Sequence, residues 1–374
     1  MWKNKRTDAN SARSIIVTSK DNNMRKRLLL PALALVLFLT ACSSQQKVLT
    51  GNTFALDTLV ELKLYSYPNK ERDSLIDDTF DQMKQLENTL SMHVEGSDID
   101  RLNQNAGKEP IAVSDITYRV LQDSLFFSEK TDGLFDVTAG PLIKLWAIDP
   151  PDGHYPSPQE LDATLPLIDY HKINFLGDSR IELADQGMIV NLGAIAKGTI
   201  AEEMKTYLLS RGVTSALINL GGNVLALGSK PDGSSFIIGI QDPSSSRGEY
   251  LMSIQIDNES VVSSGDYERY FEYEGKIYHH ILNPNTGFPA ETNIKQVTIV
   301  TDNSQKADGL STSVLLLGVQ KGIQLVESLE GVEAILITKD HYIYFTEGLR
   351  DRYETQEELI RNYTITDQLS DLKD

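Results

Sequence analysis

Apolar residues recur at helical spacing in several stretches of the chain. Within residues 71–90, the side chains of Ile76, Phe80, Met83 and Leu90 would share one face of a helix. Similar patterns, framed by polar cap residues and glycine stops, predict the other helices. These are expected at 114–130, 193–211, 304–317 and, for a short one, near 322–329.

Alternating apolar and polar residues predict strands over much of the remaining chain. A first strand is expected at 53–67, and Gly221-Gly222 and Glu274-Gly275 are flanked by strand patterns typical of hairpins. Strands and helices are interspersed without regular strand–helix–strand alternation. The pattern therefore predicts an α+β fold, a single composite domain with antiparallel or mixed sheets flanked by helices. We expect this domain at 53–348, followed by an acidic surface tail at 349–374.

The N-terminal part has a different character. A short basic segment that begins at Met24 precedes an apolar run of 14 residues, 28–41. A membrane-spanning helix needs about 20 residues, so this run predicts a signal segment. It ends in Leu-Thr-Ala-Cys at 39–42, the pattern at which bacterial lipoprotein signal peptides are cleaved.

This pattern predicts how the mature protein is anchored. We expect residues 1–41 to be removed, with Met24 as the start of the signal peptide, and Cys42 to carry lipid. Residues 42–52 would then form a tether. The expected location is the cell membrane, lipid-anchored, on the extracytoplasmic side.

Composition narrows the possible functions. The chain has 374 residues, 40% hydrophobic and 24% charged, which fits a globular protein with a sizeable core. Its net charge of −18 argues against a nucleic-acid partner, which requires a basic surface. Cys42 is the only cysteine, so an intrachain disulfide, a multi-cysteine metal site and a buried cysteine nucleophile are all excluded.

Three motifs could carry chemistry, although each also has an ordinary structural interpretation. Asp308 and Thr312 are four residues apart on a predicted helix, so they share a face and offer oxygen ligands suited to Mg²⁺. Alternatively, Asp308 only stabilises a helix N-terminus. Residues 190–204 combine a glycine turn with Lys197 at a helix start, which could hold phosphate or be simply a tight strand–helix turn.

The third motif is YHHILNPNTGFP at 278–289. Strand alternation predicts that His279 and His280 point to opposite faces, so at most one of them could be a general base in a given pocket. They could equally be two partly exposed strand histidines. A fourth segment, 131–146, could wall an aromatic ligand or supply a helix C-cap and a core Trp146.

The order of the motifs adds information that none carries alone. LDT, TDGLFDVTAGP, NLGAIAKG, INLGGN, SSGDYERY, YHHILNPNTG and ADGLSTS follow one another along the chain. In this order they closely resemble the ApbE family of FAD:protein FMN transferases, from about Phe54 to about Gly348.

The resemblance implies a set of site residues. His280 stands at the position of a catalytic base. Contacts with FAD would come from Leu56, His93, Leu134, Phe135, Asp136, Asn191, Lys197 and Leu282. The Mg²⁺ ligands would be the Ala194 carbonyl, Asp308 and Thr312. Asn191 and Asn283 replace aspartates of the family pattern and Asp57 replaces a glycine; asparagine can hydrogen-bond but carries no charge.

The resemblance also implies a reaction. With Mg²⁺, the enzyme would cleave FAD, attach FMN through a phosphoester to a threonine hydroxyl of a target protein, and release AMP. Two alternatives stay open. The protein could hydrolyse FAD to FMN and AMP, or it could be a lipoprotein that binds flavin without catalysis.

Overall fold

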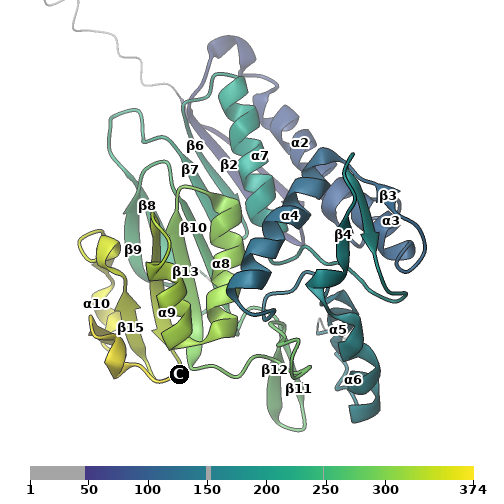
Figure 1. The fold of residues 1–374 in the computed structure, drawn as a ribbon. Helices are drawn as coiled ribbons and strands as arrows, with labels where there is room; N and C mark the ends of the chain where they lie inside the picture. The colour runs from purple at the N-terminus through teal and green to yellow at the C-terminus, as the bar shows by residue number, and fades with distance from the viewer. Residues whose placement is uncertain (1–46, 149–152, 247) are drawn as a thin grey trace, which may run out of the picture. The chain divides into compact units, whose positions relative to one another are not determined.

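Nine strands form the largest sheet of the protein (Figure 1). The computed structural model describes residues 47–148, 153–246 and 248–374. In spatial order the strands are β1 (Leu49–Ala55), β2 (Thr58–Ser66), β6 (Ser215–Leu220), β7 (Asn223–Leu227), β10 (Ser260–Gly265), β13 (Ile294–Thr301), β14 (Val332–Thr338), β15 (Tyr342–Phe345) and β17 (Thr364–Thr366). Neighbouring strands are antiparallel except β15 and β17, which are parallel. This mixed sheet, with its helices, confirms the predicted α+β fold.

Both faces of the large sheet are covered. Four helices pack on one face: α2 (Leu75–Leu90), α7 (Ala196–Ser210), α8 (Ser304–Leu317) and α9 (Val319–Glu327). A small sheet with the order β16 (Tyr353–Thr355), β9 (Tyr250–Ile256), β8 (Phe236–Gln241) packs on the other face. Alternate residues of β7 enter the two cores, Leu225 and Leu227 the first and Val224 and Ala226 the second. Residues 224–227 of β7 are accordingly all apolar, because both faces of this strand are buried.

The remaining elements extend the domain beside the helices. The additional helices on this side are α3 (Asp98–Gln104), α4 (Asp115–Lys130), α5 (Gly140–Trp146) and α6 (Pro158–Thr164), whereas α10 (Glu357–Ile360) packs on the second core, beside β9. A small sheet has the order β3 (Ile111–Ala112), β5 (Arg180–Leu183), β4 (Ile173–Phe175), and a hairpin joins β11 (Tyr270–Tyr273) to β12 (Lys276–His279). The hairpin packs through Phe271 and Tyr278 on Trp146 of α5, whose indole N–H donates to the Gly287 carbonyl at 2.7 Å. Trp146 is thus a core residue, as the structural interpretation of segment 131–146 predicts.

The first predicted strand is in fact a hairpin. Residues 53–67 were expected to run straight, but the chain turns back at Leu56 and Asp57, whose φ angles are 53° and 57°. Neither turn residue is a glycine, so the sequence lacks the usual glycine signal of a tight hairpin turn here. The Leu56 N–H donates to Glu87 Oε1 at 2.9 Å, which fastens the turn to α2. Helix α2 itself begins at Leu75, later than predicted.

The C-terminal residues 349–374 are part of the fold, and the prediction of a surface tail was wrong. Strand β17 pairs with β15 at the edge of the large sheet, and β16 pairs with β9. The last residue, Asp374, accepts a hydrogen bond from the Gln320 N–H at 2.9 Å in the first turn of α9. Leu372 is only 5% exposed. The acidic composition concealed these few anchoring residues.

The folded unit comprises Val48–Asp374. The predicted signal region, the lipidation site Cys42 and the first part of the tether lie outside the described residues. Among the residues described, no helix is both long and apolar enough to cross a bilayer.

Candidate functional site

The first turns of α7 and α8 meet at a glycine. A Cβ atom on Gly198 would lie 2.3 Å from the Ser304 carbonyl oxygen and 2.7 Å from Asp308 Cβ, so only glycine allows this approach. The Gly198 N–H donates to Asp308 Oδ2 at 2.8 Å. The contact between the helices therefore places the Asp308 carboxylate against the beginning of α7, close to Lys197.

Asp308 is a buried acid, 5% exposed. Burial raises its pKa, while the Lys197 ammonium and the bond from Gly198 act in the opposite direction. Thr312, one turn further along α8, is half-buried. Between them, Ser311 Oγ lies 2.8 Å from both the Asp308 carbonyl and Ser264 Oγ of β10, which ties this turn to the sheet. Since a buried carboxylate needs compensation, a cation at this point would be stabilised.

The Ala194 carbonyl lies outside the hydrogen-bond ladder of α7. An amide four residues later would normally bond it, but the Gly198 N–H bonds Asp308 instead, and no other backbone bond to this carbonyl occurs among the residues described. A carboxylate, a hydroxyl and a free carbonyl make an oxygen set that suits Mg²⁺. No cluster of three His, Cys, Asp or Glu side chains is found in the described chain, and Asp308 is the only charged residue among the three predicted ligands.

His280 follows β12 and is half-buried. Its ring Nδ1 lies 3.2 Å from the Arg269 carbonyl, and its backbone N–H donates to the same oxygen at 3.1 Å. A carbonyl only accepts, so Nδ1 carries the proton and Nε2 keeps its lone pair. Burial, together with the Arg269 and Lys197 charges, lowers the pKa of His280 to about 3. The imidazole is therefore neutral at physiological pH, and its Nε2 is able to accept a proton.

His279 has different partners. Its side chain is 8% exposed, and its Nε2 bonds the Ala290 carbonyl at 3.1 Å. Burial lowers the pKa of His279 as well. Its hydrogen bonds join β12 to the following loop, which is a structural role.

The predicted flavin contacts at 134–136 have unequal access to a ligand. Leu134 is half-buried, whereas Phe135 is 2% exposed and its ring packs on Phe127, so a ligand could touch only its main chain. Asp136 Oδ1 accepts from the N–H and hydroxyl of Thr138, and Oδ2 accepts from the Tyr170 N–H. The Asp136 carboxylate thus holds together the loop on which it lies.

The other predicted FAD contacts lie on separate segments. Asn191 Oδ1 accepts from the Gly193 N–H at 2.7 Å, and its Nδ2 lies 2.8 Å from Met92 Sδ, next to the exposed His93. Leu56 lies in the β1–β2 turn, and Leu282 belongs to the aromatic cluster around Trp146. Asn191 and His93 are thus brought near each other, whereas no hydrogen bond between described residues joins Leu56 or Leu282 to the other predicted contacts.

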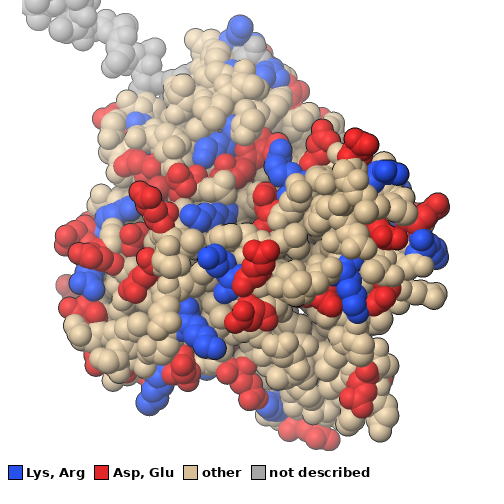
Figure 2. All heavy atoms as spheres, viewed as in Figure 1, with Lys and Arg blue, Asp and Glu red and all other residues tan. Residues whose placement is uncertain are grey.

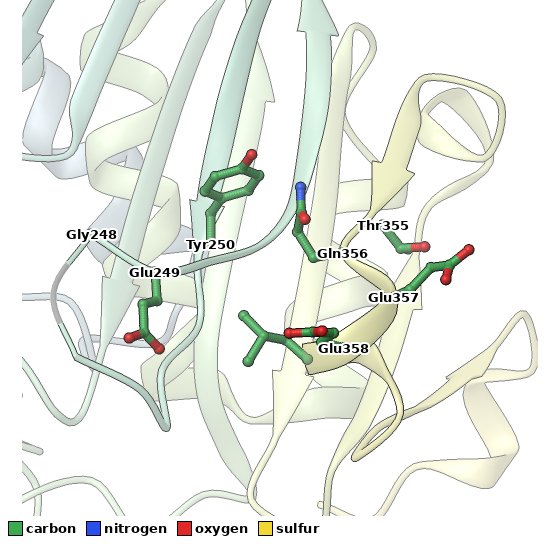
Figure 3. A pocket seen from close by; sticks show the side chains of 8 residues that line it. Gly248, Glu249, Tyr250, Thr355, Gln356, Glu357 and Glu358 are labelled. Atoms are coloured by element: carbon green, nitrogen blue, oxygen red, sulfur yellow. The ribbon is translucent and has the colours of Figure 1, made fainter.

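Two cavities lie outside this set of residues. One, of about 630 Å³, borders the β11–β12 hairpin and is lined by Tyr270, His279 and Phe288 among others. The other, of about 500 Å³, has an acidic lining that includes Glu249, Glu357 and Glu358 (Figure 3). Neither contains a predicted site residue. Sequence reasoning missed Gly198 and Arg269, which the structure places at the site.

Comparison with known proteins identifies the family. The sequence profile of the ApbE family matches residues 56–336. The chain is 34% identical over 312 residues to a Treponema pallidum protein, covering 79% of this chain and 86% of the relative. It is 33% identical to a Klebsiella pneumoniae protein, covering 83% and 95% of the two chains. Both relatives are named FAD:protein FMN transferase.

Solved structures of ApbE proteins have a similar fold. The crystal structure of the ApbE protein of Thermotoga maritima matches with a TM-score of 0.74 and 28% identity, covering 81% of this chain and 98% of that one. The apo form of the Pseudomonas stutzeri flavinyl transferase ApbE matches with a TM-score of 0.72 and 28% identity, covering 82% and 96%. The fold is that of an α+β enzyme. The chain belongs to the ApbE family.

Proposed function

We propose that this protein is a Mg²⁺-dependent flavin transferase that moves FMN from FAD onto a threonine hydroxyl of an acceptor protein. The acceptor oxygen forms a bond to the phosphorus on the FMN side of the pyrophosphate. The bond from this phosphorus to the bridging oxygen breaks, and AMP leaves with that oxygen. The observation that carries the proposal is the Gly198–Asp308 contact, which holds an acid beside Lys197 at the start of a helix.

The residues present fit the metal that this reaction requires. Asp308, Thr312 and the Ala194 carbonyl would hold Mg²⁺, which neutralises the charge of the pyrophosphate and of the departing AMP. Lys197 contributes a second positive charge to the phosphates. The Lys197 charge acts to lower the pKa of both Asp308 and His280, so one cation influences the proposed metal ligand and the proposed base.

His280 takes the proton of the acceptor hydroxyl. The Nδ1–H bond to the Arg269 carbonyl fixes the ring and leaves Nε2 as the acceptor. In the free enzyme the pKa of His280 is about 3, which makes it a weak base. Bound FAD brings negative charge close to the ring and raises this pKa, because an anion stabilises the imidazolium.

Incubation with FAD, MgCl₂ and a threonine-containing acceptor protein tests the proposal. We expect AMP by chromatography and flavin fluorescence on the acceptor band of a denaturing gel, and neither product in EDTA. AMP with free FMN and a dark acceptor band would instead identify a hydrolase. FAD binding without AMP would identify a flavin-binding protein. An Asp308→Ala variant that still releases AMP would contradict the metal site.

We also propose that the protein is lipid-anchored through Cys42 on the extracytoplasmic side of the cell membrane. Its support is the Leu-Thr-Ala-Cys pattern that follows an apolar run too short to span a bilayer. Expressed in a bacterium, the wild type should fractionate with membranes and begin at a lipid-modified Cys42. A Cys42→Ala variant should remain unprocessed. A wild-type protein that is soluble and keeps Met1 would refute the proposal.

A further inference from the structure

Arg269 lies next to the catalytic base through its main chain. It precedes β11, and its carbonyl oxygen accepts both the backbone N–H and the Nδ1–H of His280, at 3.1 and 3.2 Å. These two bonds fix residue 269 at the edge of the site. The Arg269 side chain is exposed, so a ligand in solution can reach it.

The charge of Arg269 acts on the site. After burial, the largest influence that lowers the pKa of His280 is the Arg269 guanidinium, and Lys197 acts in the same direction from α7. Two cations therefore act on the imidazole in a chain whose net charge is −18. Acidic and basic side chains are intermingled over the face shown in Figure 2.

The substrate supplies the complementary charge. FAD carries two linked phosphates, and the planar guanidinium fork is suited to bonding two phosphate oxygens at once. Lys197, at a helix start, meets such a group as a point charge. The two residues come from segments far apart in the sequence, so together they would define both the position and the orientation of the pyrophosphate.

We propose that the Arg269 guanidinium binds the pyrophosphate of FAD, with Lys197 as the second cation of the same subsite. The inference rests on the proposed function, because it assigns a substrate contact within that site. It makes the segment between β10 and β11 part of the substrate-binding machinery: its main chain orients the base and its side chain holds the substrate.

Binding of FAD and of riboflavin, which has no phosphate, tests the assignment. Each flavin is mixed with enzyme in MgCl₂ without acceptor, and quenching of its fluorescence is read by stopped flow before turnover. For Arg269→Gln we expect the Kd of FAD to rise about tenfold or more, as for loss of a charged hydrogen bond, with the Kd of riboflavin unchanged. Arg269→Lys should lie between wild type and Arg269→Gln. Arg361→Gln, at an exposed arginine of the C-terminal segment, is the matched control and should match wild type.

Each result decides the question. An unchanged Kd of FAD in Arg269→Gln would overturn the assignment, and so would equal losses for FAD and riboflavin, which indicate structural damage. Thermal unfolding of the variant, compared with that of wild type, shows whether a loss of binding comes from structural damage. If wild type binds FAD in an Arg269-dependent way but forms no AMP when an acceptor is present, only the transferase proposal is contradicted. Wild type that binds no FAD would overturn both.

Discussion

Replacing Gly198 by alanine tests the geometry on which the proposed metal site depends. The new methyl carbon would lie 2.3 Å from the Ser304 carbonyl oxygen and 2.7 Å from the Gln305 Cα atom. Both atoms belong to the backbone of the first turn of α8. Backbone atoms cannot rotate away as a flexible side chain can. To reach ordinary contact distances, the two helices must separate by about 1 Å. The 2.8 Å bond from the Gly198 N–H to Asp308 would then be lost or lengthened.

Two effects of different size should follow. Overpacking of this kind costs about 1–3 kcal/mol of unfolding free energy, so the protein should still fold. A shift of about 1 Å in a metal ligand is expected to lower kcat by about 10²-fold. Thermal unfolding and AMP release from FAD measure the two effects separately. Thr206→Ala, at an exposed position of the same helix, is the control and should match wild type in both. If Gly198→Ala keeps wild-type kcat, the close approach does not position Asp308.

Four further predictions follow from other contacts in the structure. Asp308→Asn keeps an acceptor for the Gly198 N–H, so it should melt near wild type, release no AMP and lose the rise in Tm that Mg²⁺ gives the wild type; undiminished AMP release would contradict this. His280→Ala should lower FMN transfer by about 10²–10⁴-fold, whereas His279→Ala should lower Tm and spare kcat; the reverse pattern would reassign the base. Because the folded-state pKa of His280 is about 3, the pH profile of kcat/KM should show no limb from His280 between about pH 5 and 8. The contribution of neutral His280 to the free energy of unfolding, present above about pH 6.5, should be lost as the pH falls toward 3. A limb in the ordinary histidine range that disappears in His280→Ala would refute the kinetic prediction. Deleting 364–374 removes β17 and the Asp374 bond to α9, so Tm should fall; an unchanged Tm would restore the view of this segment as a tail.

The sequence predicts an element well where its signals are local. Helix α8 was expected at 304–317 and is found there, because Asn303 accepts the Lys306 N–H at its start and Gly318, with φ of 81°, ends it. The Glu274-Gly275 turn likewise forms the expected hairpin, since both residues adopt positive φ. These features depend on residues a few positions apart, which a single sequence displays.

Features set by distant contacts were not predictable. The Leu56-Asp57 turn is held by Glu87, and the C-terminal segment is held by the first turn of α9. Neither contact produces a periodic pattern in the local sequence. The site shows the same division. Asp308 and Thr312 could be placed on one helix face, but the role of Gly198 becomes evident only when α7 meets α8. A glycine inside a helix costs about 1 kcal/mol relative to alanine, and this was the one available sign of a close approach.

The arrangement around His280 links the strength of the base to the charge of the substrate. In the free enzyme, burial and two cations, Arg269 and Lys197, keep the imidazole neutral, with a pKa of about 3. The same cations are the groups that would attract a pyrophosphate. When anionic phosphates bind beside these cations, the positive potential at the ring would fall and the pKa of His280 would rise, while burial, the largest cause of the low pKa, would remain. The Nδ1–H bond to the Arg269 carbonyl is made by the backbone, so the ring orientation does not depend on this change of charge. His280 would therefore be a stronger base in the FAD complex than in the free enzyme.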